Sequence, residues 1–410
     1  MQSSEVRKPK ICLVTYHYPF DRSPSLQNLV RDLMTTYTVV VYADHRFVRG
    51  IPDDILPFFK VLNTQSSNSD DFIPKEGKFK TFLKKMLPKS VKKIATQSLI
   101  LKYYFLHLPR FCFLLRKEPL IDVTIAADKG SLLAAILSGR PPLLYYSLEV
   151  SPFSEEPNFL FKALHIVEYL YIKFRNPYVI SQSECRINLI QERKNRQILI
   201  PVTSSGAILP KTNHLRDALG IGTDKKVLLL AGGLGSDQLT LEILTQVKFW
   251  GDQYVLVLHS ASGKYAAEVS ALACERENEG RVYLSRECFT IDGAEELIYA
   301  SADIGIVLYK DLGFNYRHTA FASGKLTAFL RSGVPLIVPD FDEFITLIEK
   351  HRFAEPSRVH NIGEAADRIL ENYASYEAAA YTAYNEIFRY ANYSGNVSKI
   401  IRQEILSVVT

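Results

Sequence analysis

The chain has 410 residues, of which 47% are hydrophobic and 23% are charged. A chain of this length exceeds what one ordinary hydrophobic core holds, so we expect two domains or more. The composition excludes an intrinsically disordered protein, and the net charge of +5 is too mild to indicate a partner by itself.

The N-terminal half alternates apolar runs with helical patterns. A strand is expected at 10–16 (KICLVTY), then a loop with Pro and Ser, a helix over 26–34 and a second strand at 38–44. Further strands are expected at 122–128, 142–147 and 178–181, with helices between them. Strand–helix–strand units of this kind predict a parallel sheet with crossover helices.

The same scheme restarts after a stretch with linker composition around residues 198–224. Strands are expected at 226–231, 254–259, 281–284, 302–309 and 335–339. The sequence therefore predicts an α/β protein with two Rossmann-like domains, 1–203 and 204–385, facing a central cleft. The tail at 386–410 is expected to be helical and to pack back toward the N-terminal domain.

The five cysteines are widely separated, with no Cys-x-x-Cys pair and no histidine at metal-ligand spacing. We therefore expect a reducing compartment and no metal site. The apolar run near the N-terminus is too short for a signal peptide, and no run approaches the roughly 18 to 20 residues that span a bilayer. These features predict a cytoplasmic or membrane-peripheral protein.

One segment is strongly basic. Eight lysines and one glutamate lie between Lys75 and Lys93, interleaved with Phe and Leu, and an apolar, aromatic stretch follows up to Lys117. The pattern of segment 75–117 suits a surface that lies on anionic lipid. A solvated basic helix beside a buried one fits equally well. Nucleic acid is not expected as a partner, because no recognisable binding motif accompanies the lysines.

Two motifs in the C-terminal half could hold an anion. Gly232 and Gly233 follow the strand at 226–231 and precede a helical pattern, although the full G-x-G-x-x-G fingerprint of NAD sites is missing. The second motif is Ser323-Gly324-Lys325 at an expected helix start, which is not a Walker P-loop. A lysine in the first turn opposes the helix dipole, so its presence there indicates an anionic partner.

These motifs occur in a familiar order. The segments VLLLAGGL, YVLVLHSASG, VYLSRE, EELIYASADIGIVLY and SGKLTAFLRSGVPLIV follow one another in the C-terminal half. Together they resemble the donor domain of bacterial GT-B glycosyltransferases of families 1 and 4. The N-terminal half is similar at lower specificity, through YYSLEV and VISQSECRINLIQ. The resemblance implies a hexosyltransferase that uses a UDP- or GDP-sugar as donor substrate, with no metal and no further cofactor.

The resemblance also implies roles for particular residues. Lys325 would contact the diphosphate of the donor, together with Ser323, Gly324, Gly232 and Gly233. Further donor contacts are expected from Arg286, His318 and Thr327. Relatives commonly carry glutamates at the positions of Ala320 and Ala328, so the resemblance assigns neither the ribose contact nor a retaining or inverting outcome here. Thr327 or a neighbouring backbone group could take over the ribose contact.

An inverting enzyme needs a general base for the acceptor hydroxyl. Glu149, at the end of the strand in YYSLEV, is the first candidate, and Asp128, which ends DVTIAAD, is the second. Asp21 and Tyr146 are candidates for acceptor binding, although an aromatic residue at a strand end more often belongs to the core.

The predicted function is sugar transfer to a hydroxyl of a glycan or lipid-linked acceptor in cell-surface polysaccharide synthesis, at the cytoplasmic face of the membrane. Two alternatives stay open at this point. One is a nucleotide-sugar epimerase of the same fold, and the other is a non-catalytic GT-B-like subunit.

Overall fold

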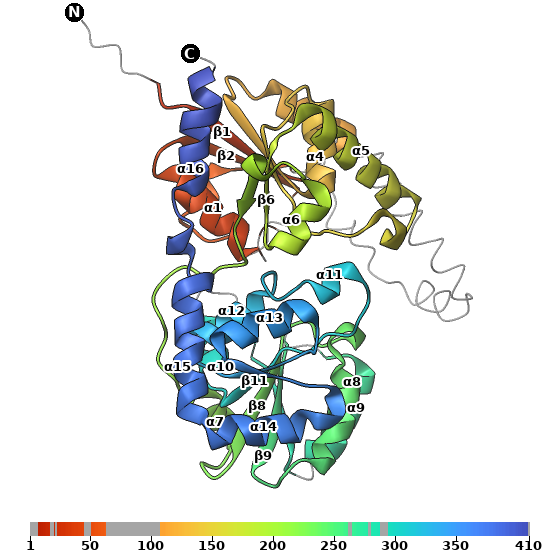
Figure 1. The fold of residues 1–410 in the computed structure, drawn as a ribbon, viewed down its shortest axis with the longest axis vertical. Coiled ribbons are helices and arrows are strands. Elements are labelled where there is room, and N and C mark those ends of the chain that lie inside the picture. Colours follow the sequence, from red (N-terminus) through yellow and green to blue (C-terminus); the bar gives the residue numbers. More distant parts are fainter. Residues whose placement is uncertain are drawn as a thin grey trace, which may run out of the picture. The chain divides into compact units, whose positions relative to one another are not determined.

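The computed structural model describes residues 7–16, 20, 23–44, 51–62, 107–260, 265–277, 280–287 and 294–408. The chain divides into two compact units, which are described separately (Figure 1). Unit 1 comprises residues 1–181, 187–198 and 395–410, and unit 2 comprises residues 182–186 and 199–394. Compared with the expected boundaries, unit 2 gains residues 182–186, 199–203 and 386–394.

Unit 1 contains a seven-stranded sheet with the order β3-β2-β1-β4-β5-β6-β7. The pairs from β3 through β6 are parallel. The strands β1 and β4 are buried along nearly their whole length, as expected for the centre of a parallel sheet. The bounds are β1 (Lys10–Thr15), β2 (Thr38–Asp44), β3 (Phe59–Leu62), β4 (Val123–Ala127), β5 (Leu144–Tyr146), β6 (Tyr178–Ser181) and β7 (Gln197–Leu199).

Helices cover both faces of this sheet. Helix α1 packs against β2 and α16, whereas α4 packs against β1, β4 and α5. Figure 1 shows α1 and α16 on one side of the strands and α4 and α5 on the other. The bounds are α1 (Pro24–Met34), α4 (Asp128–Leu137), α5 (Phe159–Arg175), α6 (Glu184–Ile190) and α16 (Asn396–Ile400), and residues 107–117 are also helical.

The C-terminal residues of unit 1 are joined to α1 by hydrogen bonds. The carboxylate of Asp32 accepts from the backbone N–H of Gly395 at 2.9 Å, and the Tyr37 hydroxyl donates to the carbonyl of Ser398 at 2.9 Å. Residues 395–410 therefore complete the N-terminal unit, although they come last in the chain.

Unit 2 contains a six-stranded parallel sheet with the order β10-β9-β8-β11-β12-β13. The bounds are β8 (Lys226–Ala231), β9 (Tyr254–His259), β10 (Val282–Ser285), β11 (Ile304–Ile306), β12 (Leu336–Val338) and β13 (Ala354–Pro356). The helices are α7 (His214–Leu219), α8 (Thr240–Gln246), α9 (Ala267–Glu277), α10 (Ala294–Ala300), α11 (Phe314–Arg317), α12 (Gly324–Arg331), α13 (Asp342–His351), α14 (Ile362–Glu371) and α15 (Tyr373–Ala383).

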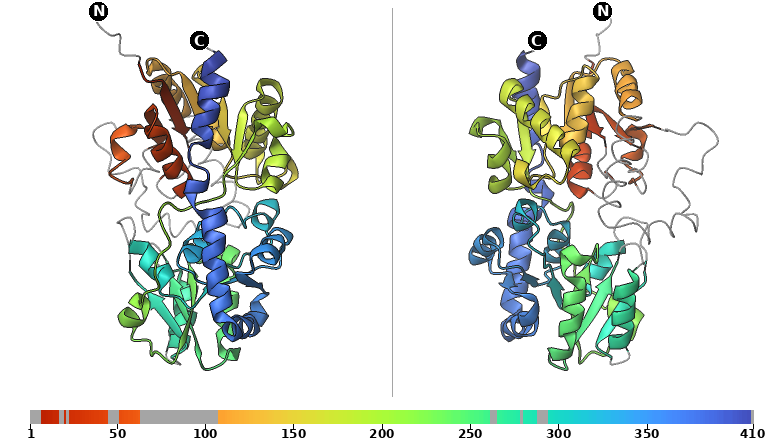
Figure 2. Two further views of the ribbon diagram at one scale, coloured as in Figure 1. Left: turned by 60° about the vertical axis from the view of Figure 1, so that its left-hand side comes forward. Right: turned by 90° about the vertical axis from the view of Figure 1, so that its right-hand side faces the viewer.

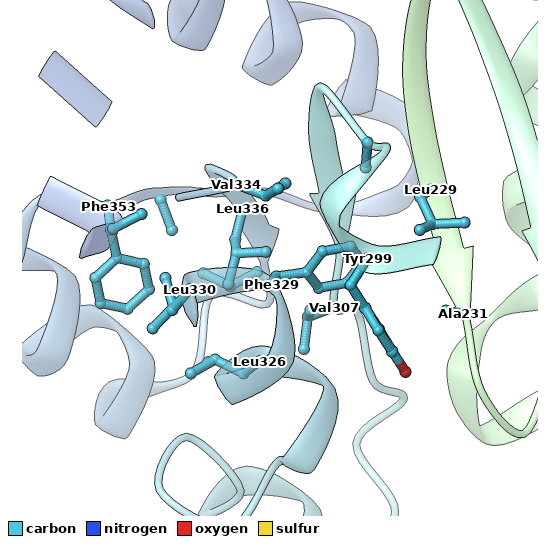
Figure 3. Close-up of a cluster of buried hydrophobic side chains, with 14 of the residues drawn as sticks. Leu229, Ala231, Tyr299, Val307, Leu326, Phe329, Leu330, Val334, Leu336 and Phe353 are labelled. Atoms are coloured by element: carbon cyan, nitrogen blue, oxygen red, sulfur yellow. The ribbon is translucent and has the colours of Figure 1, made fainter. Parts of the chain in front are cut away.

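Successive residues of β8 belong to two different cores. Leu228 and Leu230 pack with α8, α9 and α14, whereas Val227 and Leu229 pack with α10, α12 and α13. Figure 3 shows the second core, in which Phe329 of α12 lies beside Tyr299 of α10 and Leu336 of β12. The period of two along a strand explains why KVLLLA is apolar at consecutive positions, since both faces of the sheet are covered.

Both sheets reverse their winding at one point. In unit 1 the strand order turns between β1 and β4, and in unit 2 it turns between β8 and β11. Figure 2 shows the helices of each unit distributed over both faces of its sheet. The expected α/β architecture with two Rossmann-like domains is confirmed. Ligands of such sheets bind beyond the carboxyl ends of the strands at the reversal, so each unit is expected to carry its functional residues at this place.

Candidate functional site

The turn after β8 lies at the reversal of the strand order in unit 2 and contains two consecutive glycines. Gly232 has φ = +106°, a conformation that side chains rarely adopt, and its N–H donates to the carbonyl of His259 at 3.0 Å. Gly233 is exposed, and a Cβ there would lie 3.3 Å from Nε2 of Gln238. Gly232 thus shapes the turn, and the exposed Gly233 leaves its backbone open to a ligand.

The motif Ser323-Gly324-Lys325 lies at the N-terminus of α12, as expected. Ser323 is the N-cap: its hydroxyl oxygen accepts from the backbone N–H of Leu326 at 3.3 Å. The Tyr309 and Ser323 hydroxyl oxygens are 2.9 Å apart, so the loop after β11 fixes the cap. Gly324 is exposed at the first helical position. The free N–H groups of this turn and the helix dipole favour an anion here.

Lys325 joins the helix start to the glycine turn. Its Nζ donates to Oε1 of Gln238 at 2.7 Å and lies 4.8 Å from the centre of the Tyr309 ring. Desolvation lowers the pKa of Lys325 to about 7, and the nearby negative charge of Asp237 opposes that shift only in part. Among the residues that the structure describes, Asp237 is thus only a partial counter-charge for the ammonium group, and an anionic ligand would complete it.

Gln238 and Asp237 were missed as site residues on sequence alone. They occupy the positions at which the dinucleotide fingerprint fails, and the short 3₁₀ turn Ser236–Gln238 brings them back toward Lys325. Their position could have indicated them, because they lie two and three residues after Gly235, in the glycine-containing turn that follows β8. Together, Gly232, Gly233, Gln238 and Lys325 form what we call the Lys325 cluster.

Three other residues that were expected to contact the donor sugar nucleotide, Thr327, Arg286 and His318, are not part of the Lys325 cluster. The Thr327 hydroxyl donates to the carbonyl of Val202 at 2.7 Å and is buried, so it holds the 199–203 segment onto α12 and does not face a ligand. Arg286 is exposed and follows β10. In the sheet, β9 lies between β10 and β8, whose end carries the glycine turn. His318 is half-buried, with its ring 4.3 Å from that of Phe314. Thr327 therefore has a structural role through its hydroxyl.

A carboxylate from α13, that of Glu343, reaches the backbone of Ala320. The Ala320 N–H donates to Oε2 of Glu343 at 3.1 Å, and Oε1 of Glu343 lies 3.7 Å from Nδ1 of His318. Burial raises the pKa of Glu343 above its ordinary value, against the hydrogen bond from Ser183. Ala328 packs against the core and offers no polar atom. Glu343 was missed because it lies 23 residues from Ala320 in the sequence.

Cys185 lies beside this pair. Ligand atoms of Cys185, His318 and Glu343 all lie within 4.8 Å of one another. Sulfur, imidazole and carboxylate are ligands that Zn²⁺ accepts. The sequence reasoning overlooked this group because its members are far apart in the chain. The absence of a metal from the reaction therefore stays a prediction.

In unit 1, the end of β4 carries a carboxylate in an unusual setting. Asp128 has φ = +69°, which is uncommon for a residue with a side chain. Burial raises its pKa to about 7, helped by the negative charge of Glu149, while Lys129 opposes the shift. The Glu149 N–H donates to Oδ1 of Asp128 at 3.5 Å. The two residues that the sequence suggested as bases therefore lie together at the reversal between β1 and β4.

A buried ionic network lies next to Asp128 and is centred on Lys129. Lys129 pairs with Glu156 and lies 3.8 Å from Glu168, and all three side chains are buried. The Tyr145 hydroxyl donates to Glu168 at 2.5 Å. The network fixes the first turn of α4 and hence the place of Asp128. Ser131 adds to it, since its hydroxyl donates to the carbonyl of Tyr16 at 3.2 Å.

The two expected acceptor residues gain no support. Tyr146 is fully buried, which agrees with the alternative of a core aromatic. Asp21 lies outside the described residues, as does most of the basic segment 75–117, of which the structure describes only 107–117. Among the residues described, none belongs to a helix both long and apolar enough to cross a bilayer.

Comparisons with known proteins bear on the fold. No family model and no curated protein sequence matches the chain. Sucrose-phosphate synthase from Thermosynechococcus elongatus is similar in structure, with a TM-score of 0.66 and 14% identity over 98% of this chain and 100% of that one. Anabaena HepE in complex with UDP-glucose gives a TM-score of 0.64 and 14% identity, over 96% and 99% of the two chains.

A third similar structure has a different assigned activity. It is the Listeria monocytogenes protein assigned as a UDP-N-acetylglucosamine 2-epimerase, with a TM-score of 0.56 and 14% identity over 92% of this chain and 91% of that one. At this level of identity the likeness shows the fold alone. The two units, their parallel sheets and these neighbours define the GT-B fold, as the resemblance implied.

Proposed function

We propose that the protein is a glycosyltransferase that moves a hexose from a nucleoside-diphosphate sugar to a hydroxyl of a glycan or lipid-linked acceptor in cell-surface polysaccharide synthesis. The observation that carries the proposal is the Lys325 cluster at the reversal between β8 and β11. A GT-B protein whose structure holds UDP-glucose, Anabaena HepE, supports a nucleotide-sugar donor.

The chemistry follows from the charge of the donor. Transfer forms a bond between the acceptor oxygen and the anomeric carbon and breaks the bond from that carbon to the diphosphate oxygen. The departing diphosphate gains negative charge, which the Lys325 ammonium and the N–H groups of the first turn of α12 would stabilise. The backbone N–H of Gly233 would contact the same diphosphate, while that of Gly232 stays bonded to His259 and shapes the turn. Ser323 would keep the helix start in place.

Unit 1 would supply the base in an inverting reaction. The hydroxyl proton of the acceptor would pass to a carboxylate of Asp128, whose pKa of about 7 suits general base catalysis near neutral pH. Glu149 is more exposed, and its negative charge contributes to the raised pKa of Asp128. We therefore place Asp128 first as the base and Glu149 second, which reverses the order that the sequence suggested.

UDP is favoured over GDP as the nucleotide because of the HepE complex. An acceptor at the cytoplasmic face of the membrane and a transfer step without a metal are proposed from the sequence pattern and the charge of Lys325. Cys185, His318 and Glu343 are the described residues to exchange first if added Zn²⁺ changes the rate.

The test is a thermal-shift titration with UDP-glucose and GDP-mannose, followed by assay of nucleoside diphosphate release. Wild type is expected to be stabilised by one donor and Lys325→Ala to lose that stabilisation. Lys350→Ala is the matched control, since Lys350 is an exposed lysine of α13. Equal stabilisation of wild type and Lys325→Ala would remove the observation on which the proposal rests.

An epimerase is the second candidate, and the Listeria neighbour is what favours it. An epimerase would use the same diphosphate contacts but would convert the sugar nucleotide without any acceptor. Incubation of the donor alone, followed by chromatography of the sugar nucleotide, separates the two candidates. Donor binding without release or conversion in any mixture would instead indicate a non-catalytic subunit.

A further inference from the structure

Helix α5 presents an unusual face away from unit 1. The helix begins after Asn158, whose side chain accepts from the Phe161 N–H at 3.1 Å. It ends at Arg175, and the following Asn176 has φ = +47°. It packs against α4, and its buried residues repeat at helical spacing (Leu164, Glu168, Tyr171 and Ile172). Figure 1 shows α5 beyond α4, on the outer side of the unit.

The opposite face of α5 is apolar. It carries Phe159, Ile166, Tyr169, Leu170 and Phe174, with exposed fractions of 82%, 47%, 54%, 44% and 75%. These positions lie within about two-fifths of the helix circumference, at 100° per residue. Contiguous exposed apolar side chains are rare on soluble proteins unless they form an interaction surface. We call these five residues, with Lys162 and Lys173, the α5 face.

The charges on this face are all positive. Lys162 and Lys173 lie between the apolar positions, and Lys173 is 5.3 Å from the centre of the Tyr169 ring. Lys162 lies 5.5 Å from the ring of Phe153, which is itself 46% exposed. The single acidic residue of the helix, Glu168, is on the buried side and belongs to the network with Lys129. No negative charge of the helix therefore opposes an anionic partner.

We infer that the α5 face binds an anionic lipid bilayer, with the helix lying in the plane of the surface. Aromatic and aliphatic side chains would enter the acyl boundary while the two lysines contact lipid phosphates, as in amphipathic interfacial helices. At 1.5 Å per residue the helix offers a contact of about 25 Å in length. A folded protein partner would require matching negative charge as well as an apolar groove.

This inference goes beyond the proposed function, because binding to lipid needs neither donor nor transfer. It also places the lipid contact on α5, in addition to the basic segment 75–117 suggested by the sequence, most of which lies outside the described residues. If the transferase proposal also holds, α5 favours a lipid-linked acceptor over a soluble glycan.

Vesicle co-sedimentation tests the inference directly. Vesicles of phosphatidylcholine alone are compared with vesicles that contain phosphatidylglycerol, using the full chain. The test variant is Phe159→Glu/Phe174→Glu, which changes two exposed positions and leaves the buried face intact. The control is Phe249→Glu: Phe249 is 70% exposed in unit 2, and Lys248 lies 4.8 Å from its ring, so it matches the local chemistry without belonging to a face.

Wild type and Phe249→Glu should bind the anionic vesicles, and the double variant should bind at least about tenfold more weakly for each lost phenylalanine. Lys162→Glu/Lys173→Glu should also bind the anionic vesicles more weakly, by about fivefold or more per lost cation. Lys248→Glu is the control for this variant. Equal binding by wild type and both double variants overturns the inference.

Two further outcomes also overturn it. One is equal loss in Phe249→Glu, which would show a non-specific effect. The other is a lipid-free dimer in light scattering that Phe159→Glu/Phe174→Glu converts to monomer, since the face would then be covered by a second copy. The donor-binding titration on the same variants keeps this result separate from the transferase proposal, because the α5 face shares no residue with the Lys325 cluster.

Discussion

The lowered pKa of Lys325 predicts that donor affinity depends on pH. Without ligand, the Lys325 ammonium loses its proton with a pKa of about 7, chiefly because of desolvation. A diphosphate beside it stabilises the protonated form, so binding takes up a proton whenever the pH exceeds 7. Affinity for a UDP-sugar, whose diphosphate does not titrate near neutral pH, is therefore expected to fall as the pH rises above 7.

The size of the effect follows from linkage. Below pH 7 the affinity should be nearly constant, and above it the affinity should fall by about tenfold per pH unit until the pKa of the bound form is reached. Lys325→Met should weaken donor binding at pH 6 by about 10- to 150-fold, as expected for the loss of a charged hydrogen bond of about 1.5–3 kcal/mol. Its remaining affinity should not depend on pH in this range.

The assay is isothermal titration of UDP-glucose at half-unit steps from pH 6 to pH 9. Lys325→Arg is the sharpest comparison, because arginine stays charged throughout and should bind the donor without the loss above pH 7. Lys350→Met controls for surface charge. The same pH slope in wild type and Lys325→Arg would refute the reasoning, since the slope would then arise elsewhere.

The same shift has a consequence for folding. Between pH 7 and the ordinary lysine value of 10.5, the unfolded chain binds a proton at Lys325 that the folded chain does not. The contribution of Lys325 to the free energy of unfolding therefore rises with pH in this window. In urea titrations, the free energy of unfolding should rise less between pH 7 and pH 9 for Lys325→Met than for wild type.

Three other changes have clear expected outcomes. Asp128→Asn should lower the rate of nucleoside diphosphate release by about 100-fold or more while donor binding measured by calorimetry stays unchanged; an unchanged rate would exclude the residue as base. Lys129→Met leaves Glu156 and Glu168 buried without their cation, so urea unfolding should show a loss of about 3–5 kcal/mol, and a loss below about 1 kcal/mol would contradict the network. Gly305→Ala places a Cβ 2.7 Å from Cδ2 of Leu336 and 2.8 Å from the Phe329 ring, and it should lower the free energy of unfolding by about 1–3 kcal/mol in the same titration.

The order of strands and helices was accessible from the sequence because burial on both faces makes strands such as β8 apolar from Val227 to Ala231. The strand at 302–309 was expected to be longer than β11, which ends at Ile306. Beyond that residue the chain leaves the sheet to place Tyr309 beside Ser323. Strands β3, β7 and β13 were missed, since an edge strand of three or four residues has too few side chains for a periodic pattern.

The donor cluster could be predicted in part, because glycines after a strand and a lysine in a first helical turn have local physical meanings. The pKa values near 7 of Lys325 and Asp128 could not, since both arise chiefly from desolvation by burial, which depends on the folded structure. Glu343 shows the same limit: its carboxylate reaches the N–H of Ala320 from α13, although both positions looked unrelated. Sequence patterns locate a reactive group, whereas its charge state is decided by what the fold buries around it.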